Sequence, residues 1–216
     1  MPELLYPFNH IPIAKLEWPE HDFNQTKLIS FIKDFDRNNK IPEDQIVADR
    51  IKHNLSESSP HLDFFDKADI PAIRDLSLFI ENAILDLYHD LWQFQQGTHD
   101  SIEVQANIVE SWYHITRYGG YHDYHDHHTS WSGIYFLDVK ECHTKNGSMR
   151  FYKPFSTSQK IEGDVGLSWA SNDTIELLPS SGEVIFFPGF LPHAALPYFG
   201  KSHRIAIAFN ITITKC

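Results

Sequence analysis

The sequence is poor in cysteine and in basic residues, and both shortages limit the class of protein it can belong to. Its two cysteines, Cys142 and Cys216, are too few for a disulfide framework, so we expect two free thiols in a reducing compartment. Lysine and arginine together number 18 against 29 acidic residues, which gives a formal net charge of −11. A nucleic-acid-binding surface needs clustered basic residues, so we expect no nucleic-acid partner.

Long apolar runs and targeting signals are also absent. No apolar run reaches the roughly 18 residues that a membrane-spanning helix needs, so we expect no membrane partner. The N-terminus MPELLYPFNH lacks the basic-then-apolar pattern of a signal peptide, which predicts a cytoplasmic protein. The length of 216 residues and a hydrophobic content of 42% fit one domain over residues 1–216. Nothing in the sequence indicates an oligomeric state.

The hydrophobic periodicity changes near residue 100. Before this point the spacing predicts two helices, at 25–37 and at 71–94, and the second opens with Pro71, a residue suited to the first helical turn. Its apolar stripe consists of Ile73, Leu76, Ile80, Ala83, Ile84, Leu87 and Leu91. The polar and Pro/Ser-rich segment 38–68 is expected to be a loop. Residues 1–100 are therefore expected to provide mainly helical support.

After residue 100 the pattern becomes short runs of β-forming residues separated by turn residues. Strands are expected near 102–108, 111–118, 131–139, 148–152, 165–169, 173–178, 183–187 and 203–214. Helices followed by about eight strands predict an α+β domain. In it, residues 101–216 would form a β-sandwich or barrel as the catalytic core, backed by the N-terminal helices.

Histidines are concentrated in one loop of the second half. Of 14 histidines in the chain, six lie between His114 and His143. In a strand, residues two apart point to the same face, so His125 and His127 can bind one metal ion. Imidazole suits iron, zinc, copper and nickel. The alternative is a solvated polar turn, in which histidine and aspartate are common.

Two further residues, His193 and Arg204, become candidates for the same site once this histidine cluster is considered. A single histidine, His193, follows an apolar strand and a Pro/Gly turn, and a barrel can bring it beside the histidine loop. The last strand alternates: Ile205 and its apolar neighbours face one way, while Arg204, Ala206, Ala208 and Asn210 face the other. A guanidinium with space beside it can bind a carboxylate through two hydrogen bonds. The alternative is an exposed strand face, where the polar side chains meet water.

Three stretches in combination resemble the 2-oxoglutarate/Fe(II)-dependent oxygenases, in particular bacterial and phage members related to the prolyl hydroxylases. They are SWYHITRYGGYHDYHDHHTSWSGIYFL, GSMRFYKP and PSSGEVIFFPGFLPHAALPYFGKSHRIAIAFN. The resemblance covers residues 105–214. It implies a double-stranded β-helix, the jelly-roll or cupin-like barrel, backed by the N-terminal helices. It also implies Fe(II), 2-oxoglutarate and O2 as the cofactor, co-substrate and oxidant.

The resemblance implies roles for individual residues. His125 and His193 match iron ligands of the family, and no catalytic residue beyond the metal centre is implied. The family commonly has aspartate where this chain has His127, so either three imidazoles bind the metal or Asp126 or Asp123 replaces one of them. The residues expected to hold 2-oxoglutarate are Arg204, Tyr118, Tyr135 and Asn210.

The implied reaction is oxidation of a small molecule or an amino-acid-type substrate, with hydroxylation as the default outcome. One alternative is a cupin-type metalloenzyme that does not use 2-oxoglutarate, because the spacing from Gly119 to His125 and His127 fits the opening of the first cupin motif. The glutamate of that motif is absent, and Trp131 and Ser132 stand in its place. A second alternative is a non-catalytic jelly-roll module that binds a metal.

Overall fold

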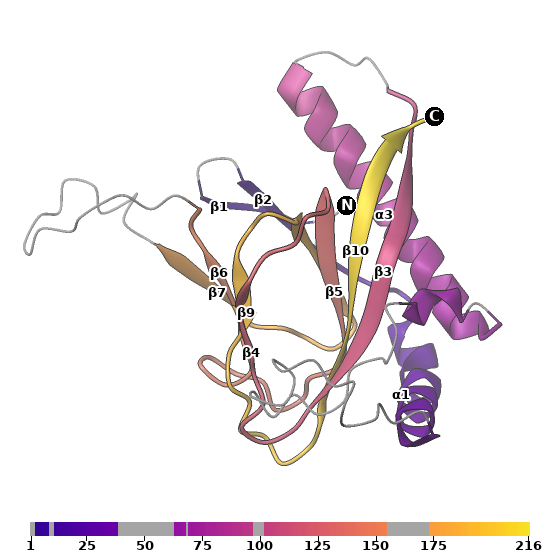
Figure 1. Cartoon of the computed structure of the whole chain (residues 1–216), viewed down its shortest axis with the longest axis vertical. Coiled ribbons are helices and arrows are strands. Elements are labelled where there is room, and N and C mark those ends of the chain that lie inside the picture. The colour runs from indigo at the N-terminus through magenta and orange to yellow at the C-terminus, as the bar shows by residue number, and fades with distance from the viewer. Residues whose placement is uncertain (1–2, 9–10, 39–62, 68, 97–101, 155–172) are drawn as a thin grey trace, which may run out of the picture.

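The computed structural model of the chain describes residues 3–8, 11–38, 63–67, 69–96, 102–154 and 173–216. Figure 1 shows the elements in chain order. They are β1 (Glu3–Phe8), β2 (Ile11–Glu17), α1 (His21–Asn38), the 3-10 helix η2 (Phe64–Asp66), α3 (Pro71–Gln96), β3 (Val104–Thr116), β4 (His122–His125), β5 (Trp131–Asp138), β6 (Met149–Tyr152), β7 (Thr174–Leu177), β8 (Glu183–Pro188), β9 (His193–Ala195) and β10 (Arg204–Lys215).

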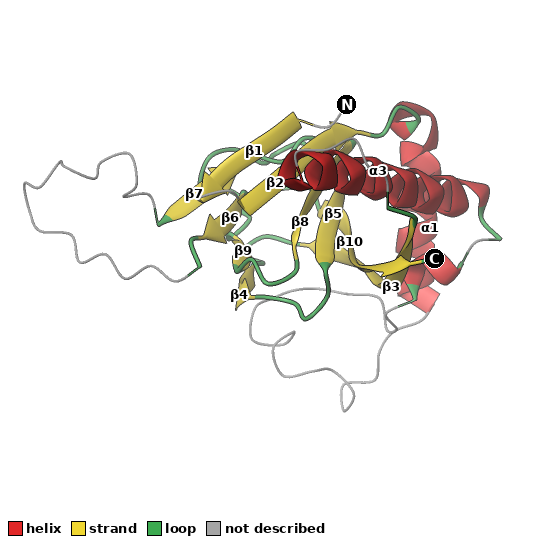
Figure 2. Ribbon diagram, turned by 90° about the horizontal axis from the view of Figure 1, so that it is seen from above, coloured by secondary structure: helices red, strands yellow, loops and turns green. Residues whose placement is uncertain are grey.

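The strands form two antiparallel sheets. The larger has the order β1-β2-β8-β5-β10-β3, and the smaller has the order β4-β9-β6-β7. The two sheets pack face to face, and α1 and α3 lie on the outer face of the larger sheet (Figure 2). This arrangement is a double-stranded β-helix backed by helices, so the expected fold class is confirmed.

Two apolar cores hold the layers together. The first joins the helices to the larger sheet, through residues such as Leu28, Ile80 and Ile207. The second lies between the two sheets and consists of Ile13, Phe136, Val139, Met149, Phe151, Ile185, Phe187, Leu191 and Ala206. Strand β10 serves both cores, because Ile205, Ile207, Phe209 and Ile211 face the helices while Ala206 faces the smaller sheet. The alternation expected for this strand is confirmed.

Both expected helices are present, with longer bounds than the sequence indicated. Helix α3 begins at Pro71, and Ile73, Leu76, Ile80 and Leu87 of its stripe are completely buried. Neither α1 nor α3 has an apolar stretch that would let it cross a membrane. Part of the expected loop 38–68 forms η2, and residues 39–62 lie outside the described residues.

The strand predictions for the second half are largely confirmed, with differences at β3 and at the smaller sheet. The expected strands 102–108 and 111–118 are one strand, β3, with a bulge where Asn210 pairs with Glu110 and Ile211 pairs with Ile108. Strands β4 and β9 were not expected, because four and three residues are too few to give a periodic signal. The expected strand 165–169 lies outside the described residues.

Two strands at the N-terminus were not expected from the sequence. β2 pairs with β8 and so extends the larger sheet, and β1 pairs with β2. Pro12 within β2 argues against a strand in a sequence reading, because proline cannot donate a ladder hydrogen bond. Residues 1–100 therefore contribute sheet as well as helices.

The packing of α3 on the sheet predicts unequal effects for two apolar residues of this helix. Ile80 is completely buried, whereas Leu78 is 50% exposed. Ile80→Ala should lower the free energy of unfolding by about 2–5 kcal/mol, because it leaves a cavity in the core. Leu78→Ala should change it by about 0.5 kcal/mol or less. Urea denaturation measures both, and equal losses would show that α3 does not cover the sheet through the stripe.

Candidate metal centre

Two adjacent strands of the smaller sheet bring His125 and His193 together. His125, the last residue of β4, pairs with His193, the first residue of β9. The centres of their rings are 4.2 Å apart. His193 is 3% exposed, so one member of the pair is held in the interior. Residues 68 positions apart in the sequence thus become neighbours through strand pairing, as a barrel topology predicts.

His127 joins this pair from the loop that follows β4. Its backbone N–H donates to the carbonyl oxygen of Gly189 at 2.8 Å, which holds the loop against the turn before β9. A Cβ at position 189 would collide with the backbone of Thr129, so glycine permits this close approach. Within the described residues, the ligand atoms of His125, His127 and His193 lie within 4.8 Å of one another and form the one such group.

Backbone carbonyls fix the protonation of two of these imidazoles. Nδ1 of His125 lies 2.7 Å from the carbonyl oxygen of Asp123, and Nδ1 of His193 lies 3.0 Å from that of Leu191. A carbonyl oxygen only accepts, so the hydrogen of each ring is on Nδ1. The Nε2 lone pair of each ring is then available to a metal ion, which is the usual arrangement around histidine ligands.

Burial also keeps all three imidazoles neutral. Desolvation lowers the pKa of His125 and lowers that of His193 well below its ordinary value. It lowers the pKa of His127 to about 4. Neutral imidazole is the form that binds a metal, and it suits iron. The chemistry of this donor set therefore fits Fe(II).

The carboxylates considered as alternative ligands are placed differently. Asp123 Oδ1 accepts a hydrogen bond from the backbone N–H of Tyr124 at 2.8 Å. Asp126 is exposed. Neither belongs to the group formed by the three histidines within the described part of the chain. The geometry thus favours three imidazoles.

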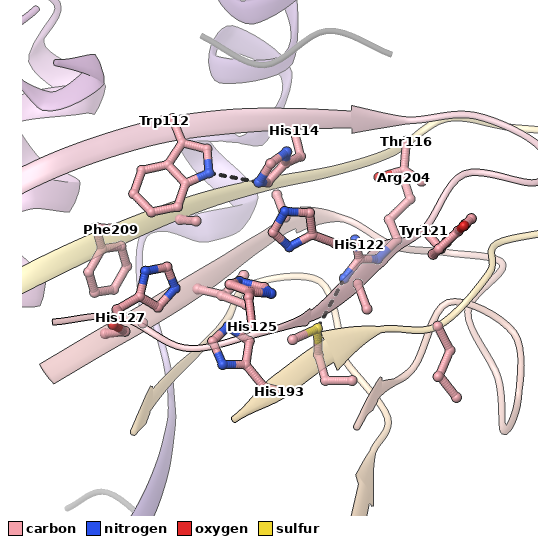
Figure 3. A pocket seen from close by; sticks show the side chains of 18 of the residues that line it. Trp112, His114, Thr116, Tyr121, His122, His125, His127, His193, Arg204 and Phe209 are labelled. Carbon is pink, nitrogen blue, oxygen red and sulfur yellow. Dashed lines mark hydrogen bonds between the residues drawn. The ribbon is translucent and has the colours of Figure 1, made fainter. Parts of the chain in front are cut away.

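Arg204 lies in the same cavity as the histidines (Figure 3). It is 4% exposed, its Nη2 lies 3.7 Å from the sulfur of Met149, and its Nε has no hydrogen-bond partner. Thr116 pairs with Arg204 across β3 and β10, and its buried hydroxyl also has no partner. Buried polar groups are normally satisfied, so these two point to an anionic ligand that accepts from both. The far carboxylate of 2-oxoglutarate fits this requirement.

The structure does not bring the two expected tyrosines to this cavity. Tyr118 is 68% exposed and its ring packs edge-on against Phe199. Tyr135 is completely buried on the helix side of β5, where its hydroxyl lies 2.6 Å from Nδ1 of His21. Because side chains alternate along a strand, Ser132 and Ile134 of β5 border the cavity and Tyr135 does not. The resemblance to tyrosines of the family did not indicate which way the side chains of Tyr118 and Tyr135 face.

Asn210 is the fourth residue expected to hold 2-oxoglutarate. It lies beside His127, six residues after Arg204 along β10. Its side chain is bonded to Ser132 and Glu110, and its Nδ2 is 3.4 Å from Nδ1 of His127. It borders a second, more open cavity next to His127, and it does not line the cavity that contains Arg204.

Several residues that line the main cavity were missed in the sequence. His114 and Thr116 follow Trp112 at intervals of two along β3, and all three face inward. The indole N–H of Trp112 donates to Nε2 of His114 at 2.7 Å, and the ring of His122 lies 4.0 Å from that of His125 (Figure 3). Side chains alternate along β3, so one residue known to face the cavity, such as Trp112, would have identified His114 and Thr116 as cavity residues.

The structure is a double-stranded β-helix with three histidines that could hold a metal ion and a buried arginine in the same cavity. A sequence profile described as "Putative 2OG-Fe(II) oxygenase" matches residues 110–210. This match confirms the resemblance to the 2-oxoglutarate/Fe(II)-dependent oxygenases seen in the sequence. The chain is an oxygenase that uses Fe(II), 2-oxoglutarate and O2. No curated protein sequence matches the chain significantly.

Solved structures support the fold at low sequence identity. HygX from Streptomyces hygroscopicus, with nickel and 2-oxoglutarate bound, is 10% identical with a TM-score of 0.59, over 96% of this chain and 84% of that chain. A prolyl-4-hydroxylase from Pseudomonas putida is 14% identical with a TM-score of 0.53, over 93% of each chain. SnoN, a 2-oxoglutarate-dependent epimerase from nogalamycin biosynthesis, is 8% identical with a TM-score of 0.57, over 94% of this chain and 78% of that chain.

The metal centre predicts unequal effects for two neighbouring histidines. His193→Ala removes a buried ligand, so it should weaken binding of Co(II), a redox-stable substitute for Fe(II), by about 100-fold or more and abolish turnover. His128→Ala removes an exposed imidazole next to His127 that is not part of the group, so binding should stay within about threefold. Anaerobic titration followed by visible absorption measures both. Unchanged binding in His193→Ala would rule out the assigned centre.

Proposed function

We propose that this oxygenase hydroxylates a small molecule or an amino-acid residue, with His125, His127 and His193 as the metal ligands and Arg204 as the anchor of 2-oxoglutarate. When bound by the imidazoles, Fe(II) supplies oxygen activation coupled to the oxidation of 2-oxoglutarate to succinate and CO2. The chain itself contributes binding, orientation and exclusion of water.

The observation that carries the proposal is the pair of unsatisfied donors at one end of the cavity. Arg204 Nε and the Thr116 hydroxyl are both buried without a partner, and no carboxylate of the described residues pairs with Arg204. A permanently charged guanidinium out of water is costly unless an anion approaches it. A dicarboxylate reaching from the imidazoles to Arg204 satisfies this requirement.

The walls between the two ends of the cavity suit such a ligand. Ala206 and Ala208 lie inward on β10 beyond Arg204, and their small side chains leave room along the strand. Phe187 and Leu196 border the same space and give it an apolar wall. Apolar surroundings strengthen the attraction between Arg204 and a bound carboxylate.

The substrate class rests on the comparisons and on charge. The neighbours include a prolyl-4-hydroxylase and an epimerase of nogalamycin biosynthesis, so both amino-acid residues and small molecules are consistent with this fold. A net charge of −11 argues against nucleic acid. Hydroxylation is favoured over halogenation, because His127 fills the ligand position that halogenases leave to a small residue.

A cupin-type metalloenzyme without 2-oxoglutarate is the second reading, based on the spacing from Gly119 to His127. It gives no reason for a buried Arg204 beside an unpaired Thr116. It also does not account for the family match over residues 110–210. These observations favour the oxygenase.

The co-substrate anchor is tested by the rate of succinate formation at varied 2-oxoglutarate concentration. Arg204→Ala should raise the KM for 2-oxoglutarate by about 10- to 100-fold, because it removes charged hydrogen bonds. Thr116→Val should raise it by about two- to tenfold, because it removes a neutral one. Tyr118→Phe changes an exposed hydroxyl outside the cavity and should leave it unchanged. An unchanged KM in Arg204→Ala would contradict the proposal.

A further inference from the structure

His127 differs from the other two imidazoles in what supports it. His125 and His193 donate from Nδ1 to backbone carbonyls, whereas Nδ1 of His127 faces the side-chain amide of Asn210 at 3.4 Å. Groups behind the ligands orient them and tune the metal, and they carry a large share of its affinity. The group that faces Nδ1 of His127 is therefore a donor on a side chain, and not a carbonyl that accepts a hydrogen bond from the ring.

Asn210 forms a hydrogen-bonded group with Glu110 and Ser132, and the three residues lie on three neighbouring strands of the larger sheet. Asn210 on β10 pairs with Glu110 on β3 and with Ser132 on β5. Its Nδ2 donates to Glu110 Oε2 at 2.6 Å, and its Oδ1 accepts from the Ser132 hydroxyl at 2.7 Å. Asn210 is 3% exposed, so the amide is held in a fixed orientation between the carboxylate and His127.

A bulge in β3 lies next to Glu110. The register of β3 and β10 shifts between Asn210 and Ile211, so Val109 has no partner in the ladder. Such bulges bend a strand and redirect the adjacent side chain, and they are common beside active sites. Here the residue after the bulge is the carboxylate that contacts Asn210.

The balance of charges at the proposed metal centre suggests a role for the carboxylate of Glu110. Three neutral imidazoles leave both positive charges on a divalent metal, and Arg204 adds a third to the buried site. Bound 2-oxoglutarate is a dianion, so one positive charge remains. In a site with an aspartate ligand that charge would already be cancelled. Glu110 is a further acidic group, and it borders the same open cavity as His127.

We propose that Glu110, held beside His127 by its hydrogen bond with Asn210, supplies to the metal centre, through space, the negative charge that a three-histidine ligand set lacks. This inference rests on the proposed metal centre. It assigns to Asn210 the role of holding the carboxylate of Glu110 beside His127, in place of a contact with 2-oxoglutarate. Replacing the charge of Glu110 should weaken metal binding without changing any ligand.

The direct test compares Glu110→Gln with Asp126→Asn by anaerobic titration of Co(II). Both variants remove one carboxylate charge near His127, but Asp126 is exposed and its charge is screened by water. Glu110→Gln should raise the dissociation constant of Co(II) by about tenfold or more, the usual effect of losing a group behind a ligand. Asp126→Asn should change it by about threefold or less. Equal effects, or none in Glu110→Gln, would overturn the inference.

A second background separates charge from structure. His127→Asp introduces a carboxylate as a ligand, so the site then has the charge that Glu110 is proposed to supply. In this background Glu110→Gln should change the Co(II) dissociation constant by about threefold or less, or tighten binding by relieving repulsion between two carboxylates. A purely structural role of Glu110 would weaken binding equally in both backgrounds and would overturn the inference.

Failure of this inference is distinguishable from failure of the proposed function. If His193→Ala weakens Co(II) binding and Glu110→Gln does not, the metal centre stands and the role of Glu110 is wrong. If the unmodified protein does not bind Co(II), or His193→Ala binds it equally well, the metal centre itself is wrong and so is the inference that rests on it. Circular dichroism of each variant shows that its fold is intact.

Discussion

The proposed binding site depends on keeping the guanidinium of Arg204 out of water. No carboxylate of the described residues pairs with Arg204, and its neighbours include the sulfur of Met149, the thiol of Cys142 and the ring of Phe136. Burying an unpaired charge costs free energy that the apolar cores must offset. β10 makes this placement feasible, because it is paired on both edges and packs its other face against the helices. The same strand thus provides stability on one side and a binding site on the other.

The sequence was sufficient for those features that repeat along the chain. The stripe of α3 and the alternation of β10 each extend over at least five residues, so the buried side could be identified. β4 and β9 are too short for such a pattern, although they hold His125 and His193. Their histidines were found through residue chemistry and a family resemblance. Where a short strand carries a ligand, composition is therefore a better guide than periodicity.

The errors at the site have one physical origin, which is that chemical suitability does not fix direction. Tyr135 is the right kind of residue to bind a carboxylate, but the pleat of β5 points it at His21 on the helix side. Thr116 is a less conspicuous residue, yet cross-strand pairing sets it opposite Arg204. The face of the strand on which a residue lies, and not its chemical type, decides which of two suitable hydroxyls reaches the cavity.

The departure of this chain from the common ligand pattern is also better understood in space than in sequence. His127 stands where the family commonly has a carboxylate. From the sequence of this loop alone, the negative charge of that ligand is missing. The bulged β3 brings Glu110 to Asn210, and Asn210 lies against His127, although Glu110 precedes that histidine by 17 residues. On the proposed role of Glu110, the negative charge has moved from the ligand set to the strand behind it. The electrostatic requirement of the metal is then the same, and a different part of the fold meets it.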